Sequence, residues 1–255
     1  AQALDGTERL RVMDSLVRPS KRFEFDWDKM SQFRGIRTKD LIAPMCLDFS
    51  PEGRADAFCS DGVYGSVLAI RDFGSMLEDS YLASIIDLPM PLSVSLHMQP
   101  IAQSDALAMV KRQLDWMDKE IIDEQMAAVK KGYDYSILPP ELRYSKEEAE
   151  ELLDFLRNKN ERLFVYTGLV YTYADSLEEL DRQVEQVVSV AQGNSLGIVG
   201  LDYRQKPALN SMLPLGRNHV NVSRHLTTGQ IAMQMPFASQ ELNQEGGGYY
   251  GQSKQ

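Results

Sequence analysis

Residues 193–197, Gly-Asn-Ser-Leu-Gly, match the G-x-S-x-G pattern of a serine nucleophile elbow, and Asp202, His219 and His225 follow them. In such an elbow the serine follows a strand and precedes a helix, so that its hydroxyl lies on a strained turn beside backbone N–H donors. Here a helical pattern precedes Ser195 and a strand pattern follows it. Because this order is reversed, we expect Gly193 to end the helix in a simple turn. An esterase-type enzyme that uses Ser195 or the carboxylates of the chain stays an alternative.

Metal-binding patterns are weak. The three histidines, His97, His219 and His225, have no cysteine at metal-ligand spacing, which argues against a zinc site. A group of five carboxylates could bind a hard cation, but it lies on a predicted helix and lacks the glycine-containing loop of a calcium site. We interpret the group as a solvated helix face or as a surface for a basic partner. Its members are Glu147, Glu148, Glu150, Glu151 and Asp154.

Nucleotide-binding loops are missing from the sequence. Neither G-x-x-x-x-G-K-[ST] nor G-x-G-x-x-G occurs, so no cofactor is expected to bind this chain through such a loop. Glycines 246–248 follow no strand and precede no helix, which is typical of a flexible linker. Tyr166, Tyr171 and Tyr173 share one predicted strand, but the glycine-aromatic signature of RNA-binding sheets is absent. We expect these tyrosines to pack in the core and at the edge of a sheet.

The charge balance argues against nucleic acid as a direct partner. The 255 residues carry a formal net charge of -10, whereas affinity for phosphate backbones comes from Lys and Arg. The segment from Arg9 to Lys39 is an exception, with nine basic and four acidic residues. This basic arm is interpreted as a solvated irregular segment or as a contact for acidic lipid headgroups or an acidic partner.

Cysteine usage and the chain ends give expectations about location. Cys46 and Cys59 cannot form a disulfide framework, so we expect two buried free thiols in a cytosolic protein. No apolar stretch approaches the roughly 20 residues that span a bilayer, and the N-terminus lacks the pattern of a signal peptide. The first residue, Ala1, is not Met, which suggests a fragment of a longer protein.

Periodicity predicts alternating strands and helices after an irregular segment 1–39. Strict alternation predicts a strand over Leu92–Gln99, and steps of three and four predict a helix over about 103–131. Ser145–Glu148 has the pattern of a capping box and is expected to start the second helix of a hairpin. The other expected elements are strands at Leu41–Phe49, Val63–Phe73, Arg162–Ala174 and Leu196–Tyr203, a helix at Asp79–Leu88, and a helix that begins after Ser176 and ends at Gly193.

This order predicts an α+β fold. Two strand-helix-strand units in tandem resemble the ferredoxin-like split βαβ arrangement, an antiparallel sheet with helices on one face. A helical hairpin at about 103–160 is inserted between the units. The predicted organisation is an irregular basic N-terminal arm at 1–39, an α+β domain at 40–213 and a connector at 214–255.

The last part of the chain resembles a known junction. Leu213–Asn218, Leu226–Thr228 and Pro236–Leu242 are similar to the segment ahead of the motor domain in the conjugative-transfer ATPases of type IV secretion systems, the TrbE/CagE/VirB group. Thr38–Pro44 resembles the start of the N-terminal domain of that family. The resemblance marks seven connector residues, namely Pro214, Gly216, Arg217, Thr227, Thr228, Pro236 and Phe237.

The resemblance implies an anchoring and assembly domain cut off before the Walker A motif. Such a domain has no catalytic residues of its own, and ATP and Mg²⁺ would bind the motor domain of the parent protein. It would attach that motor to inner-membrane channel components of a DNA-transfer system, in the cytoplasm at the inner face of the cell membrane. The implied partners are those channel components and its own C-terminal ATPase domain, and self-association into a homo-oligomer is also allowed. The alternative is a freestanding acidic α+β protein-interaction module without a motor.

Overall fold

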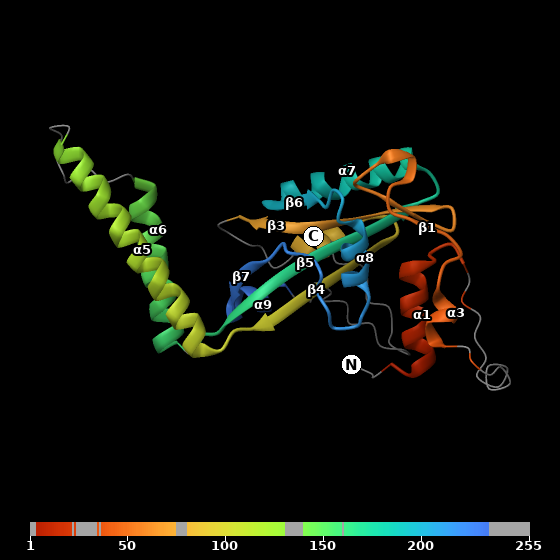
Figure 1. Cartoon of the computed structure of the whole chain (residues 1–255), viewed down its shortest axis with the longest axis horizontal. Helices are drawn as coiled ribbons and strands as arrows, with labels where there is room; N and C mark the ends of the chain where they lie inside the picture. Colours follow the sequence, from red (N-terminus) through yellow and green to blue (C-terminus); the bar gives the residue numbers. More distant parts are fainter. Residues whose placement is uncertain are drawn as a thin grey trace, which may run out of the picture.

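The computed structural model describes residues 4–21, 23, 35, 37–74, 81–130, 140–159 and 161–234. An antiparallel sheet runs through the main body of the molecule, and a long helical hairpin projects from it (Figure 1). The protein is therefore mixed α and β, as its sequence predicts. The strands are β1 Leu47–Asp48, β2 Phe58–Ser60, β3 Val63–Phe73, β4 Leu92–Pro100, β5 Leu163–Ala174, β6 Leu196–Gly200 and β7 Arg224–Thr227. The helices are α1 Gly6–Val17, α3 Thr38–Ile42, α4 Tyr81–Ile86, α5 Gln103–Lys130, α6 Pro140–Asn158, α7 Leu177–Gly193, α8 Gln205–Met212 and α9 Thr228–Ala232, with a short 3-10 turn, η1, at Pro51–Gly53.

The sheet is built around two long antiparallel neighbours, β3 and β5, whose register pairs Tyr64 with Ala174 and Ile70 with Gly168. β4 pairs antiparallel with the other edge of β5, and β6 pairs antiparallel with β3. It follows that β3 and β4 run parallel with β5 between them, and that β5 and β6 run parallel with β3 between them. β1 and β2 extend the sheet beside the first half of β3, and β7 lies beside the first half of β5.

One face of the sheet is covered by α4 and α7. Leu82 and Ile85 of α4 and Val187 and Ala191 of α7 pack in one buried cluster with apolar residues of β3, β5 and β6. The hydroxyl of Ser176 accepts the N–H of Glu179 at 3.2 Å, so this serine caps α7 as the sequence predicts. The strand predictions for β3, β4 and β5 and the helix predictions for α4 and α7 are confirmed.

The opposite face is covered as well, by α8, the segment after it and α1. Leu209 and Met212 of α8, Val220 and Leu16 share a second buried cluster with Phe58, Val67, Ala69, Leu169 and Tyr171 of the sheet. The expectation of helices on one face only is therefore wrong. α8 has no counterpart among the predicted elements. The strand before it, β6, ends at Gly200 and not at Tyr203 as predicted.

Gln205 closes a gap at the edge of β3. β2 pairs with β3 only as far as Gly65, and β6 begins to pair at Leu68. Between these two strands, Oε1 of Gln205 accepts the N–H of Val67 at 2.9 Å, and its Nε2 donates to the Val67 carbonyl at 3.1 Å. The Gln205 side chain is 1% exposed, so its amide group takes the place of a strand within the core.

The turn between β2 and β3 consists of Asp61 and Gly62, with φ of 50° and 91°. Positive φ at both positions is typical of the tight type I′ turn that joins antiparallel strands. The Asp61 carboxylate accepts the N–H of Cys46 at 2.8 Å and forms an ion pair with Lys21 at 2.5 Å. These contacts, with the Lys21 hydrogen bond first, lower the pKa of Asp61 below its ordinary value.

The N-terminal region differs from its prediction. Residues 6–17 form α1, which starts at a capping box of Asp5 and Glu8, so the irregular assignment of the basic arm is wrong there. Much of the rest of that arm lies outside the described residues. The strand expected at Leu41–Phe49 is also wrong, because α3 occupies Thr38–Ile42 and only Leu47–Asp48 pair as β1.

The hairpin follows its prediction except at one end. α5 matches the expected helix, whereas α6 begins at Pro140, so Ser145 lies inside the helix and does not cap it. The two helices share a buried cluster of Ala106, Val110 and Leu156 that reaches Leu163 at the start of β5. The base of the hairpin therefore has a hydrophobic cluster of its own that includes the first residue of β5.

Candidate functional site

The predicted connector residues lie at two places in the structure. Pro214, Gly216 and Arg217 are exposed in the loop after α8, where Gly216 has a φ of 67°. Thr227 and Thr228 lie at the junction of β7 and α9. Pro236 and Phe237, like glycines 246–248, are outside the described residues.

Between these two places the chain is fastened to the sheet through Thr167 of β5. The side-chain amide of Asn218 donates to Oγ1 of Thr167 at 2.9 Å, and that hydroxyl donates to the carbonyl of Val222 at 2.8 Å. Val220, between the two, is buried in the core. The alternation of Val220 and Val222 is visible in the sequence, but no local pattern identifies Thr167 as their anchor. The predicted connector is thus built into the fold over residues 218–227.

The junction of β7 and α9 meets the base of the hairpin. Thr227 caps α9 through a reciprocal pair of hydrogen bonds with Gln230, and T-x-x-Q is a pattern that could have been found in the sequence. Oγ1 of Thr228 accepts the N–H of Arg162 at 3.0 Å. Arg162 lies in the short link between α6 and β5, so this bond joins the predicted connector to the point where the hairpin ends.

The base of the hairpin is held by further bonds. The N–H of Ile101 donates to the carbonyl of Leu163 at 2.9 Å, which joins the chain entering the hairpin to the chain leaving it. The amide of Gln103 donates to the carbonyl of Leu156 at 2.5 Å, near the end of α6. With the buried cluster at the same place, these bonds fix the hairpin to β4 and β5.

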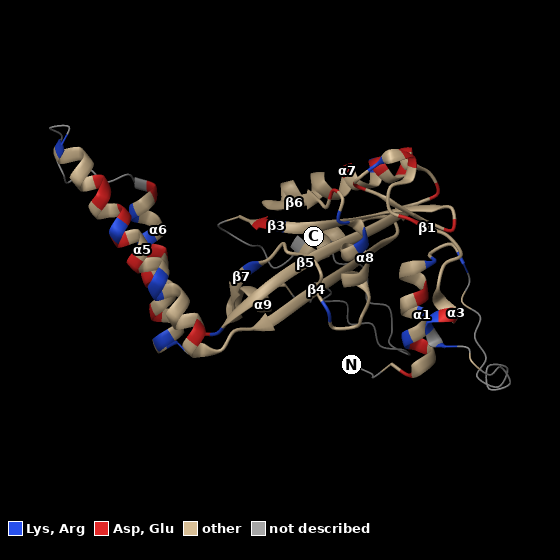
Figure 2. Ribbon diagram, viewed as in Figure 1, with Lys and Arg blue, Asp and Glu red and all other residues tan. Residues whose placement is uncertain are grey.

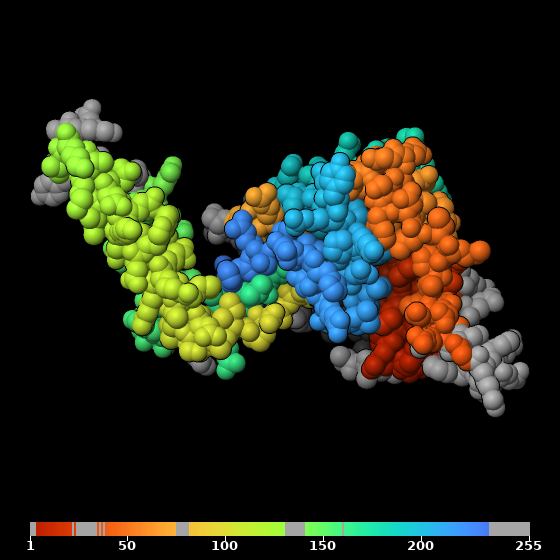
Figure 3. Space-filling model, viewed as in Figure 1, coloured from red at the N-terminus to blue at the C-terminus, as the bar shows by residue number. Residues whose placement is uncertain are grey.

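The outer half of α5 carries an exposed apolar stripe. Ile122, Met126 and Val129 are 49%, 58% and 60% exposed, and their spacing of four and three residues places them on one side of the helix. This side is distinct from that of the buried positions Val110 and Met117, of which Val110 packs in the cluster shared with α6. Figure 3 shows the outer half of the hairpin standing clear of the main body. We call Ile122, Met126 and Val129 the hairpin stripe.

Both helices of the hairpin carry acidic and basic residues along their length (Figure 2). α6 alone carries six acidic and three basic residues, including the five carboxylates singled out in the sequence, which are all exposed as expected for a solvated face. Nζ of Lys146 pairs with the Asp118 carboxylate at 2.6 Å across the hairpin, and this hydrogen bond raises the pKa of Lys146. The hairpin therefore presents apolar side chains within a mainly acidic surface, which suits a partner with apolar and basic groups.

Ser195 lies in the turn between α7 and β6, with a φ of 58°. Helix α7 precedes it and strand β6 follows it, so the predicted order of helix, turn and strand is confirmed. His97 is half-buried and its Nε2 lies 2.8 Å from the carbonyl of Ser211. Tyr166 and Tyr171 are buried, as predicted from the sequence. Both cysteines are free, but Cys46 is exposed and Cys59 only half-buried, so the expectation of two buried thiols is wrong.

Among the described residues, no group of three or more His, Cys, Asp or Glu side chains is arranged to hold a metal ion. None of the helices in the described part of the chain combines the length and the apolar character that crossing a membrane requires. A scan against protein-family models found no match, and a search among curated proteins found none either.

Proposed function

We propose that this chain is the N-terminal anchoring and assembly domain of a conjugative type IV secretion ATPase and docks the motor onto the inner-membrane channel complex. The observation that carries the proposal is the hairpin. It is fixed at its base to β4 and β5, it projects from the body, and its outer half exposes the hairpin stripe within an acidic surface. A rigid, amphipathic arm of this kind is suited to insertion into a groove of a partner protein.

The topology supports a ferredoxin-like core for this domain. Each of the two strand-helix-strand units, β3-α4-β4 and β5-α7-β6, has two parallel strands separated by one strand of the other unit. That interleaving is the property that defines a split βαβ unit. The hairpin is inserted at the connection between the two units.

The predicted connector supports the same function. Residues 222 and 228 of the predicted connector bond Thr167 and Arg162 near the hairpin base, and on this proposal the connector leads on to the motor domain. A motor that follows this chain would thus be held close to the arm that docks it. On this proposal ATP and Mg²⁺ bind the motor domain, and this domain lies in the cytoplasm at the inner face of the membrane.

The docking role is tested with a triple variant of the hairpin stripe, Ile122→Ser, Met126→Ser and Val129→Ser. The assay measures binding of the purified chain to inverted inner-membrane vesicles from cells that carry the parent conjugative element. A matched control replaces three exposed apolar residues outside the hairpin, Met45→Ser, Ile86→Ser and Leu215→Ser. We expect binding to fall by about tenfold or more in the stripe variant, as loss of a buried apolar anchor predicts, and to change little in the control.

Equal binding to vesicles from cells without the element would contradict the proposal, as would ATP hydrolysis by this chain alone. The alternative, a freestanding acidic interaction module, is separated by sequencing the parent gene beyond the codon for Gln255. A strand followed by G-x-x-x-x-G-K-[ST] supports the ATPase proposal. A reading frame that ends or continues without this loop supports the module.

A further inference from the structure

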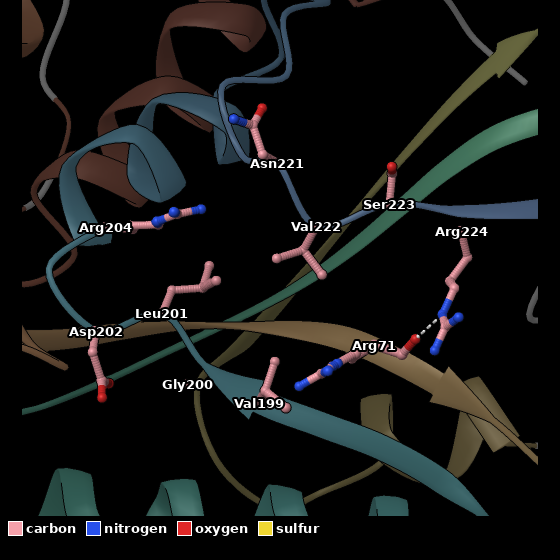
Figure 4. A pocket seen from close by; sticks show the side chains of 10 residues that line it. All are labelled: Arg71, Val199, Gly200, Leu201, Asp202, Arg204, Asn221, Val222, Ser223 and Arg224. Carbon is pink, nitrogen blue, oxygen red and sulfur yellow. Dashed lines mark hydrogen bonds between the residues drawn. The ribbon is translucent and has the colours of Figure 1, made fainter.

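An open pocket of about 530 Å³ lies where the predicted connector crosses the face of the sheet that α8 covers. Three parts of the chain form it, namely the end of β3, the turn from β6 into α8, and residues 221–224 (Figure 4). Val199, Leu201 and Val222 give it apolar walls, while arginines from all three parts line it. This pocket is separate from the hairpin and does not depend on the proposed docking function.

Arg71 enters the pocket from a β-bulge. The register of β3 against β6 shifts between Ile70 and Asp72, which leaves Arg71 as the extra residue of the bulge. Nε of Arg224 donates to the carbonyl of Arg71 at 2.7 Å, and the same guanidinium pairs with Asp72. The bulge is thus held by Arg224. The Arg71 side chain itself is 63% exposed, and within the described residues its one ionic contact is a long one, 3.9 Å, to the Asp72 carboxylate that Arg224 already binds.

Arg204 enters from the other side, at the N-cap of α8. Its side chain makes no capping bond and forms no hydrogen bond or ion pair with any other residue in the described part of the chain. Asp202 also lines the pocket, but Figure 4 shows its carboxylate turned away from the guanidinium groups of Arg71 and Arg204. Two guanidinium groups without a committed carboxylate therefore reach into one pocket of a protein whose formal net charge is -10.

We propose that this pocket binds a phosphate group, held between Arg71 and Arg204. Like charges that face one pocket repel each other, and an anion between them removes that repulsion. A guanidinium binds an oxyanion through two parallel N–H donors. A carboxylate has one edge, which accepts one such pair of donors. A phosphate has oxygens on several sides and accepts a pair of donors from each of two guanidinium groups. Arg224 holds the β-bulge in place through its bonds with the Arg71 carbonyl and Asp72. Leu201 and Val222 contact the less polar part of the molecule that carries the phosphate.

The consequence is a ligand that bridges the sheet and the predicted connector. Arg71 belongs to β3, Arg204 precedes α8, and Asn221 and Ser223 line the pocket from the connector side. Binding would tie the connector to the sheet more firmly. The phosphate comes from a small phosphate ester or from a phospholipid headgroup, which share this chemistry.

The test compares the full chain with the double variant Arg71→Ala and Arg204→Ala. Both substitutions leave the backbone of the pocket in place. The Arg71 carbonyl still accepts the Nε–H of Arg224, and the Arg204 side chain does not cap α8. A matched control removes two exposed arginines elsewhere, Arg157→Ala on α6 and Arg182→Ala on α7. The probe is glycerol 3-phosphate at constant ionic strength, followed by the amide NMR signals of Gly200, Leu201 and Ser223. Coincident urea unfolding curves check that all variants fold.

We expect saturable shifts in the parent and the control, and an affinity at least about tenfold lower in the double variant, as the loss of two charge-assisted contacts predicts. A second arm measures co-sedimentation with vesicles of phosphatidylglycerol or, for comparison, of phosphatidylcholine alone. Arginine-dependent binding of glycerol 3-phosphate assigns a small phosphate ester, and arginine-dependent binding only to phosphatidylglycerol vesicles assigns a headgroup. NMR shifts that do not saturate at constant ionic strength, together with vesicle binding that the double variant retains, would overturn the proposal. Acetate that binds as tightly as glycerol 3-phosphate would overturn it as well.

Discussion

Replacing Gln205 by leucine should reveal how strongly a single side chain joins two strands of the sheet. Gln205 supplies both hydrogen-bond partners of the Val67 backbone in the interval between β2 and β6, and its Nε2 also lies 3.3 Å from the carbonyl of Leu201. Leucine has a similar size but no polar atoms. In the Gln205→Leu variant the N–H and the carbonyl of Val67 stay buried and lose their partners, because Val67 is in the core of the second face.

The expected cost follows from these two groups. A buried backbone donor or acceptor left without a partner costs about 1–3 kcal/mol, so two groups give about 2–6 kcal/mol. Burial of the leucine side chain recovers about 1–2 kcal/mol, since the polar amide it replaces contributes no apolar area. The difference between the two terms spans about 0–5 kcal/mol, and we expect the free energy of unfolding to fall by its middle value, about 2.5 kcal/mol, a large part of the 5–15 kcal/mol typical of a folded domain.

Urea unfolding followed by circular dichroism measures this change, and Gln183→Leu is the matched control. Gln183 is also buried, in α7, but within the described part of the chain its amide oxygen accepts one hydrogen bond, from the hydroxyl of Thr172, and that hydroxyl has a second acceptor in the carbonyl of Pro91. The control should cost about 1 kcal/mol, the net value of one ordinary hydrogen bond. A cost for Gln205→Leu no greater than that of Gln183→Leu would refute the idea that the amide replaces a strand. Unchanged amide exchange at Val67 would refute it too.

Two further predictions concern the turn of β2 and β3 and the junction of β7 and α9. The pKa of Asp61 is lowered on folding, so its stabilising effect is present above the pKa of about 3.9 of an unfolded aspartate and is lost as the pH falls through the lower folded value. The difference in unfolding free energy between the parent and Asp61→Asn should therefore shrink between pH 5 and pH 2.5 in urea titrations, and an equal difference at both pH values would exclude this role of the Lys21 pair. Thr228→Val removes the acceptor of the Arg162 N–H, so we expect a loss of about 1 kcal/mol in local stability and faster amide exchange at Arg162. The control Thr7→Val in α1 should leave amide exchange at Arg162 unchanged. Unchanged exchange at Arg162 in the Thr228 variant would show that the junction is held by other contacts.

Local sequence patterns predict the elements that bury a regular face. β4 alternates strictly, β5 is apolar on both faces because α7 and α8 cover its two sides, and Ser176 caps α7. Each of these signals is contained in one continuous segment, so the pattern of that segment alone predicts the element. The main strands and the hairpin follow directly from them.

The elements that the patterns miss depend on competing local signals or on distant partners. α1 starts at a capping box of Asp5 and Glu8, but the basic composition and Pro19 favour an irregular segment there. Ser145 has the residue types of a cap, yet helix α6 already starts at Pro140. Gln205 lies 138 residues from its partner Val67, and no spacing rule connects them. The arginine pocket is missed for the same reason, because its residues come from three separate parts of the chain.

The contacts of residues 218–228 determine how the proposed motor domain would act on this one. A connector that hung free from Leu213 would transmit little force, since a flexible chain adjusts its own conformation first. Here Asn218 and Val222 are tied to Thr167 within β5, and Thr228 is tied to Arg162, directly before the same strand. β5 also borders the hairpin, because α6 leads into it through Arg162. A pull on the chain beyond α9 would thus act on β5 and on the hairpin base together, and the proposed docking arm and the attachment of the proposed motor would move as one unit.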